Sequence, residues 1–145
     1  YKSTEELVEL CLRLSKFKKE NKELLTYMLF ESIDEEAFVA NVKAEVDADL
    51  ENINTKNFYY IKKSLRKILR NLKKYIRYSP KKETELELLI YYCKCLQEFK
   101  PSIKRNATLM NLYTRQVAAI KKILSGLHED LQFDYQQEIE DLEDF

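Results

Sequence analysis

Glycine and proline are nearly absent from this chain, which has one Gly and two Pro among its 145 residues. Gly alone usually makes up about 7% of a protein. Tight turns between β-strands need residues that accept positive φ angles, and Gly supplies most of them. Leu, Glu, Lys and Arg, which favour helices, are abundant instead. We therefore predict an all-α fold.

The size and composition of the chain indicate a folded protein. A chain of 145 residues is long enough to bury a core without disulfides or metal. Its 45% hydrophobic and 34% charged residues are typical of globular rather than disordered proteins. Three cysteines are an odd number, and Cys93 and Cys95 stand in an apolar run, which favours buried, reduced thiols and a cytoplasmic location. No apolar run approaches the ~20 residues that span a bilayer, and no signal-peptide pattern precedes the first helix, so we expect no membrane association.

Capping residues predict where the first four helices begin. Ser3 and Glu6 form a capping box at the first helix. A polar "KKEN" separates it from "ELLTYMLFES", which is apolar on nearly every side and is expected to be buried. Asp34 begins a third helix, and Asn54 or Thr55 is expected to cap a fourth that runs to Tyr78.

Two further helices and an acidic C-terminal segment are expected in the second half of the chain. Ser79 and Pro80 are expected to begin the fifth helix, "ETELELLIYYCKCLQEF", whose hydrophobicity predicts a central position. Pro101 begins a sixth helix that ends before Gly126. The last segment, residues 127–145, is amphipathic and acidic.

Short loops between these helices predict antiparallel neighbours. We expect residues 1–126 to form a single all-helical domain, followed by an acidic C-terminal helix or tail at 127–145. A compact bundle of six or seven helices is favoured, because the helix pairs show no self-similarity. A short superhelix of repeated helical hairpins is the alternative.

The most unusual stretch is "KKSLRKILRNLKKYIRYSPKK", residues 62–82, which holds ten Lys or Arg and no Asp or Glu. A helix turns by about 100° per residue, so its apolar residues, from Phe58 to Ile76, fall on one stripe that is expected to face the core. The opposite arc carries the candidate binding residues Tyr59, Lys62, Lys63, Arg66, Lys67, Arg70, Lys73, Lys74 and Arg77.

Several roles fit this basic helix. Residues 31–54 and 129–145 carry eight acids each, so they could neutralise it within the fold. It could instead bind an acidic protein partner, or the phosphates of RNA or DNA with nearby tyrosines stacking on unpaired bases. In a further hypothesis, the acidic C-terminal segment covers the basic face until a stronger anion displaces it. A membrane surface is disfavoured, because the core needs the apolar stripe.

Signatures of catalysis are missing from the sequence. His128 is the only histidine, and one glycine cannot make a Gly-rich phosphate loop. Cys93 and Cys95 diverge by about 200° on a helix, so they cannot share one zinc ion. "DADLEN", residues 47–52, lacks the Gly and Glu of a calcium loop. We therefore expect no enzyme activity, no cofactor and no metal.

The stretches "LRLSKFKKENKELLTYMLFE" and "NTKNFYYIKKSLRKILRNLKKYIRYS" resemble a small family of cytoplasmic, all-helical bacterial proteins with no known activity. The resemblance implies an all-α fold and a cytoplasmic location, and it implies no site. From the residues we expect a non-enzymatic protein-interaction module that uses the basic, Tyr-bordered helix at 55–78. The alternative is an RNA- or DNA-binding protein that uses the same helix. The sequence leaves the oligomeric state open.

Overall fold

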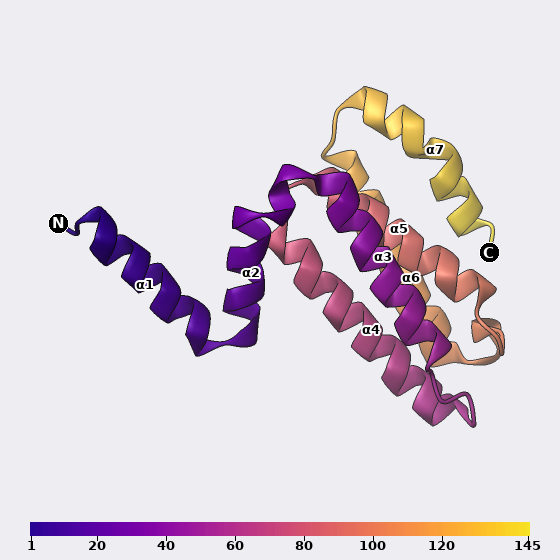
Figure 1. The fold of residues 1–145 in the computed structure, drawn as a ribbon. Coiled ribbons are helices and arrows are strands. Elements are labelled where there is room, and N and C mark those ends of the chain that lie inside the picture. Colours follow the sequence, from indigo (N-terminus) through magenta and orange to yellow (C-terminus); the bar gives the residue numbers. More distant parts are fainter. The chain divides into compact units, whose positions relative to one another are not determined.

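A computed structural model describes all 145 residues and contains only helices, so the predicted all-α class is confirmed (Figure 1). There are seven α-helices and two short 3-10 helices. In chain order they are α1 (Thr4–Phe17), α2 (Lys19–Leu29), η1 (Glu31–Ile33), α3 (Glu35–Glu51), α4 (Phe58–Tyr78), α5 (Lys82–Glu98), η2 (Ile103–Arg105), α6 (Ala107–Ser125) and α7 (Glu129–Glu143).

The chain divides into two compact units, Tyr1–Ala40 and Asn41–Phe145. The first unit holds α1, α2, η1 and the beginning of α3, and the second holds the rest of α3 and all later helices. The acidic segment at 127–145 therefore belongs to the second unit.

The first unit has a small core. The rings of Tyr27 and Phe38 contact each other there with centres 4.7 Å apart, and the Tyr27 hydroxyl donates a hydrogen bond to Glu35 at 2.7 Å. The capping box of Ser3 and Glu6 is present, as predicted. The prediction that the second segment is buried is wrong, since Tyr27 is the one buried residue of α2. Its neighbours Met28, Leu29 and Phe30 are exposed, because a unit with so few helices cannot surround them.

The second unit is built around α5, as its hydrophobicity predicted. This helix packs against α4, α6 and α7, and it contributes the fully buried Leu86, Leu88, Tyr92 and Cys93. The Tyr92 hydroxyl donates a hydrogen bond to the backbone carbonyl of Leu65 on α4 at 2.8 Å. The position of α4 is therefore fixed by apolar packing and by one buried hydrogen bond to the central helix.

Helix α7 lies against α5 and α6. Its buried Ile139 and Leu142 face them, as the amphipathic pattern predicted. Lys94 on α5 pairs with Glu138 at 3.0 Å, and Lys121 on α6 pairs with Glu143 at 3.1 Å. The acidic character of α7 thus matches lysines of the two helices on which it packs.

Three predicted helix starts are wrong by a few residues. The fourth helix begins at Phe58 with Asn57 as N-cap, because Asn54 accepts a hydrogen bond from the Lys56 backbone and forms a turn instead. Ser79 likewise accepts from the Lys81 backbone, and α5 begins at Lys82. Pro101 and Ser102 lead into the 3-10 turn η2, and Asn106 caps α6.

Candidate functional site

The basic face of α4 rests on a long, uninterrupted helix. Asn57 caps it by accepting a hydrogen bond from the Tyr60 backbone at 3.2 Å, and no Gly or Pro occurs before Tyr78. Its 21 residues correspond to a rod of about 30 Å. The stripe that packs on the core is buried at Ile61, Leu65, Ile68, Leu69 and Leu72. The segment therefore coils continuously and hides its apolar side, as the helical wheel predicted.

The candidate binding residues lie on the other side of α4, hereafter the basic face. Lys62, which stands at the border of the arc, and Lys74 are partly buried. The remaining members are exposed: Tyr59, Lys63, Arg66, Lys67, Arg70, Lys73 and Arg77. All nine come from one helix, so their mutual placement depends on that helix alone.

The cations of the basic face are largely without carboxylate partners. Elsewhere in the second unit, lysines reach acids across helices, as in the pairs Lys43–Glu87, Lys94–Glu138 and Lys121–Glu143. No carboxylate lies within 4.0 Å of Lys62, Lys63, Arg66, Lys67, Arg70, Lys73 or Arg77. The acidic blocks of the chain therefore do not neutralise these seven side chains by direct contact.

Five of the exposed cations form a straight row along the helix. The row contains Lys63, Arg66, Arg70, Lys73 and Arg77, with alternating spacings of three and four residues. Because this averages 3.5 residues, the row drifts little around the helix, and it extends about 21 Å at 1.5 Å per residue. Positive charge thus recurs about every 5 Å along a nearly straight line.

Tyrosines border the basic face at both ends. Near the N-terminus, the rings of Tyr59 and Tyr60 meet edge to face with centres 5.3 Å apart, and Tyr59 remains 65% exposed. Near the C-terminus, the Lys74 ammonium lies 4.6 Å from the centre of the Tyr75 ring. These rings give the face apolar surface beside its charges, a combination that is common at protein interfaces.

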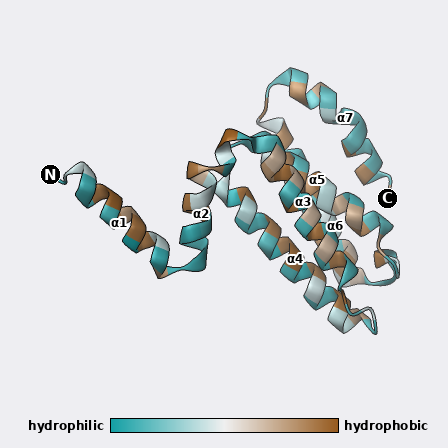
Figure 2. Ribbon diagram, in the orientation of Figure 1, coloured by the Kyte–Doolittle hydropathy of each residue, from teal (hydrophilic) through white to brown (hydrophobic).

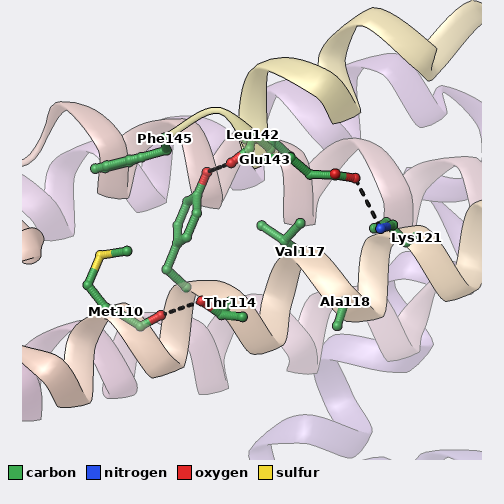
Figure 3. A pocket seen from close by; sticks show the side chains of 9 residues that line it. Met110, Thr114, Val117, Ala118, Lys121, Leu142, Glu143 and Phe145 are labelled. Atoms are coloured by element: carbon green, nitrogen blue, oxygen red, sulfur yellow. Dashed lines mark hydrogen bonds and ion pairs between the residues drawn. The ribbon is translucent and has the colours of Figure 1, made fainter.

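A second candidate is a hollow of about 510 Å³ between α6 and α7. Met110, Val117 and Leu142 contribute apolar surface, and the Lys121–Glu143 ion pair lies at one end of the hollow (Figure 3). Tyr113 donates a hydrogen bond to the Leu142 carbonyl at 2.6 Å. The ionisable side chains that line this hollow, Tyr113, Lys121 and Glu143, therefore interact with one another or with the backbone.

Burial shifts the pKa of the groups at the centre of the second unit. It raises the pKa of the Cys93 thiol to about 12 and that of the half-buried Cys95 thiol to about 11. The pKa values of Tyr91 and Tyr92 are also raised, first by burial, and for Tyr91 additionally by its hydrogen bond to Asp47. These groups stay neutral at pH 7. The Tyr91–Asp47 contact joins α5 to α3, and the sequence pattern did not reveal it.

The single histidine has a structural role. The Nδ1 atom of His128 accepts a hydrogen bond from the Asp130 backbone at 3.1 Å, which caps α7.

No group of three or more His, Cys, Asp or Glu side chains is arranged to hold a metal ion. None of the helices combines the length and the apolar character that crossing a membrane requires.

Comparison with known proteins found no matching family model, no matching curated protein and no matching solved structure.

Proposed function

We propose that this protein is a non-enzymatic interaction module whose basic face binds an acidic segment of another protein. The observation that carries this proposal is the row of exposed cations on α4 that have no carboxylate partner in the chain. The proposed setting is the cytoplasm, which the three free thiols support.

The shape of the row favours a helical partner. A helix that carries acids at alternating spacings of three and four residues presents them every 5 Å or so along one side. That repeat matches the row from Lys63 to Arg77, so the two rows can meet over several turns. Arg66 and Arg70 stand near the middle of the row and can each bind a carboxylate with two parallel hydrogen bonds.

RNA or DNA is the second candidate partner, and the exposed ring of Tyr59 is the observation that favours it. An aromatic ring beside a line of cations can stack on an unpaired base while the cations contact phosphates. A nucleic-acid partner would be bound with an affinity that falls steeply with salt, in proportion to the number of phosphates neutralised.

The double variant Arg66→Glu/Arg70→Glu tests the basic face. Arg115→Glu/Lys122→Glu is its matched control, because it makes the same charge change with two exposed cations of α6 that have no ion pair. Each protein is titrated into a labelled helical peptide with Glu at the repeat of the row, and into a labelled single-stranded RNA. Fluorescence anisotropy reports both affinities.

We expect wild type and control to bind the peptide alike, and the Arg66→Glu/Arg70→Glu variant to bind it about tenfold or more weakly, because two attractions become repulsions. Equal peptide binding by all three proteins would contradict the proposal. RNA bound much more tightly than the peptide, and lost in the same variant, would establish the second candidate in its place.

A further inference from the structure

Helix α7 carries a row of acids on the side that faces solvent. The row contains Asp130, Asp134, Asp141 and Asp144, with the neutral Gln137 at its centre. All five side chains are exposed, and Figure 2 shows hydrophilic residues recurring along this helix. Asp144 directly follows the last residue of α7 and keeps right-handed helical angles, with φ −76° and ψ −3°, so it continues the row. Helix α7 therefore packs through one side and presents carboxylates on the other.

The acids of this row differ from those that hold α7 in place. Glu138 and Glu143 pair with lysines of α5 and α6. No Lys or Arg lies within 4.0 Å of any carboxylate of the row. Asp130 has the neighbouring His128 at 3.5 Å. The row is therefore open to cations of another molecule while α7 stays packed.

The acidic row of α7 matches the cation row of α4 in length and in spacing. From Lys63 to Arg77 the successive spacings are three, four, three and four residues. From Asp144 back to Asp130 they are also three, four, three and four. Each row extends about 21 Å at 1.5 Å per residue. When the two helices run antiparallel, one register therefore brings all five positions together, and its facing pairs are Lys63–Asp144, Arg66–Asp141, Arg70–Gln137, Lys73–Asp134 and Arg77–Asp130.

Charge favours this contact over its alternatives. Residues 55–82 hold no Asp or Glu, and residues 129–145 hold no Lys or Arg, so the two helices bring no like charges together. The antiparallel register gives four pairs of opposite charge, and Arg70 faces an amide whose oxygen accepts hydrogen bonds. A parallel pair aligns at most four of the five positions, because its spacings run in the opposite order. No other helix of the chain carries four acids at this spacing.

We propose that the acidic helix bound by the basic face is α7 of a second copy of this chain, so that the protein self-associates through an antiparallel α4–α7 contact. The inference rests on the proposed function, because it uses the same row of cations, and it names the partner. Within one copy, α4 and α7 both pack on α5 and lie along different edges of the second unit (Figure 1), and no carboxylate reaches the row of cations. The contact joins unlike surfaces, so each copy of a pair still offers one row, and association can continue beyond a dimer.

Salt dependence is the first test. Exposed ion pairs are individually weak, so four of them give a dissociation constant on the order of 1 mM at low salt. Sedimentation equilibrium of the 145-residue chain, at up to about 1 mM protein in about 0.02 M salt, is expected to show an average mass well above that of one chain. In about 0.5 M salt the mass is expected to return to that of the monomer, because salt screens the pairs.

A charge swap tests the register. Arg66→Glu places like charges opposite one another at Asp141, so the dissociation constant is expected to rise about fivefold or more. Arg66→Glu/Asp141→Arg restores opposite charges in every contact, because each copy carries both changes. This double variant is expected to associate like the wild type.

The matched control for the charge swap is Arg66→Glu/Glu140→Arg, which has the same net charge as the first double variant. Glu140 and Asp141 are both exposed, and each accepts a hydrogen bond from a glutamine four residues earlier. Glu140 lies about 100° from Asp141 around the helix and is therefore off the row. The control is expected to associate as weakly as Arg66→Glu alone.

Several outcomes would overturn the inference. A wild-type chain that stays monomeric at low salt but binds the helical Glu peptide would remove α7 as the partner and leave the proposed function standing. A chain that neither associates nor binds the peptide would contradict both. Self-association that neither salt nor Arg66→Glu weakens would place the contact on another surface. Equal recovery by both double variants, or recovery by neither, would contradict the antiparallel register.

Discussion

At the scale of single residues, the hydroxyl of Tyr92 is the buried polar group that ties α4 to the core. It is fully buried and donates its hydrogen bond to the Leu65 carbonyl. Tyr92→Phe keeps the ring and removes this bond, so we expect the free energy of unfolding to fall by about 1 kcal/mol at neutral pH. Urea denaturation followed by circular dichroism measures the change. No loss of stability would mean that the bond does not help to position α4.

The difference in stability between the wild type and Tyr92→Phe is expected to change with pH in a defined direction. Burial raises the pKa of Tyr92 above its ordinary value of about 10. Above that value the unfolded chain loses the phenol proton and the native protein keeps it, so the stability of the wild type falls with pH by up to about 1.4 kcal/mol per unit for this group. Tyr92→Phe lacks this contribution. The stability deficit of the variant is therefore expected to narrow between neutral pH and about pH 11, and a constant deficit would contradict the shift.

The three thiols are expected to differ in reactivity because they differ in exposure. Cys11 is exposed, Cys95 is partly buried and Cys93 is buried, with its pKa raised to about 12. The thiolate is the reactive form, so a thiol that is both buried and protonated reacts slowly. Titration of the native protein with a chromogenic disulfide should label Cys11 first and Cys93 only on unfolding. Fast labelling of all three thiols in the native state would show that α5 is not packed as described.

At the scale of the helix, α4 depends on its N-cap more than the acidic helices do. No acidic residue stands in its first turn to interact favourably with the helix dipole, and Asn57 alone accepts a hydrogen bond there. Asn57→Ala is expected to lower the free energy of unfolding by about 1 kcal/mol. Asn111→Ala, an exposed site inside α6, is the control and should be neutral or slightly stabilising. Equal effects in urea denaturation would contradict this role of Asn57.

The helices themselves were predictable from the sequence, because their signals are local. Spacing of apolar residues and scarcity of Gly predicted six or seven helices, and the caps at Ser3 and Asp34 were located correctly. The starts of α4, α5 and α6 were not located correctly from the sequence. At least one Asn or Ser near each start can accept a backbone hydrogen bond, and the choice between capping a helix and closing a turn depends on the surrounding chain.

Burial was predictable for α4 and not for the first unit. The stripe from Ile61 to Leu72 packs against α5 as the wheel predicted. The apolar residues of α1 follow the same periodicity but are exposed, because periodicity identifies a face without identifying what covers it. The residues of the basic face were likewise predictable from the wheel. The absence of carboxylates around them depends on where α7 packs, which periodicity cannot reveal.

At the scale of the whole molecule, a net charge of zero conceals strong segregation of charge. In the second unit the acids of α7 pair with lysines of α5 and α6, and the row of cations from Lys63 to Arg77 lacks such pairs. The hypothesis that the acidic segment covers the basic face would require α7 to leave its buried contacts at Ile139 and Leu142. The row of cations from Lys63 to Arg77 is exposed with α7 in its packed position. These cations can therefore bind a partner without any movement of α7.

Affinity capture with the 145-residue chain tests the central claim, that the row of exposed cations from Lys63 to Arg77 on α4 forms a protein-binding surface. Wild type, Arg66→Glu/Arg70→Glu and the Arg115→Glu/Lys122→Glu control are each immobilised and exposed to lysate of the source cells, with and without nuclease treatment, and quantitative mass spectrometry compares what they retain. The account predicts a protein with an acidic helical segment that is held by wild type and control and lost from the α4 variant. Identical retention by all three proteins, or retention that nuclease abolishes, would contradict it.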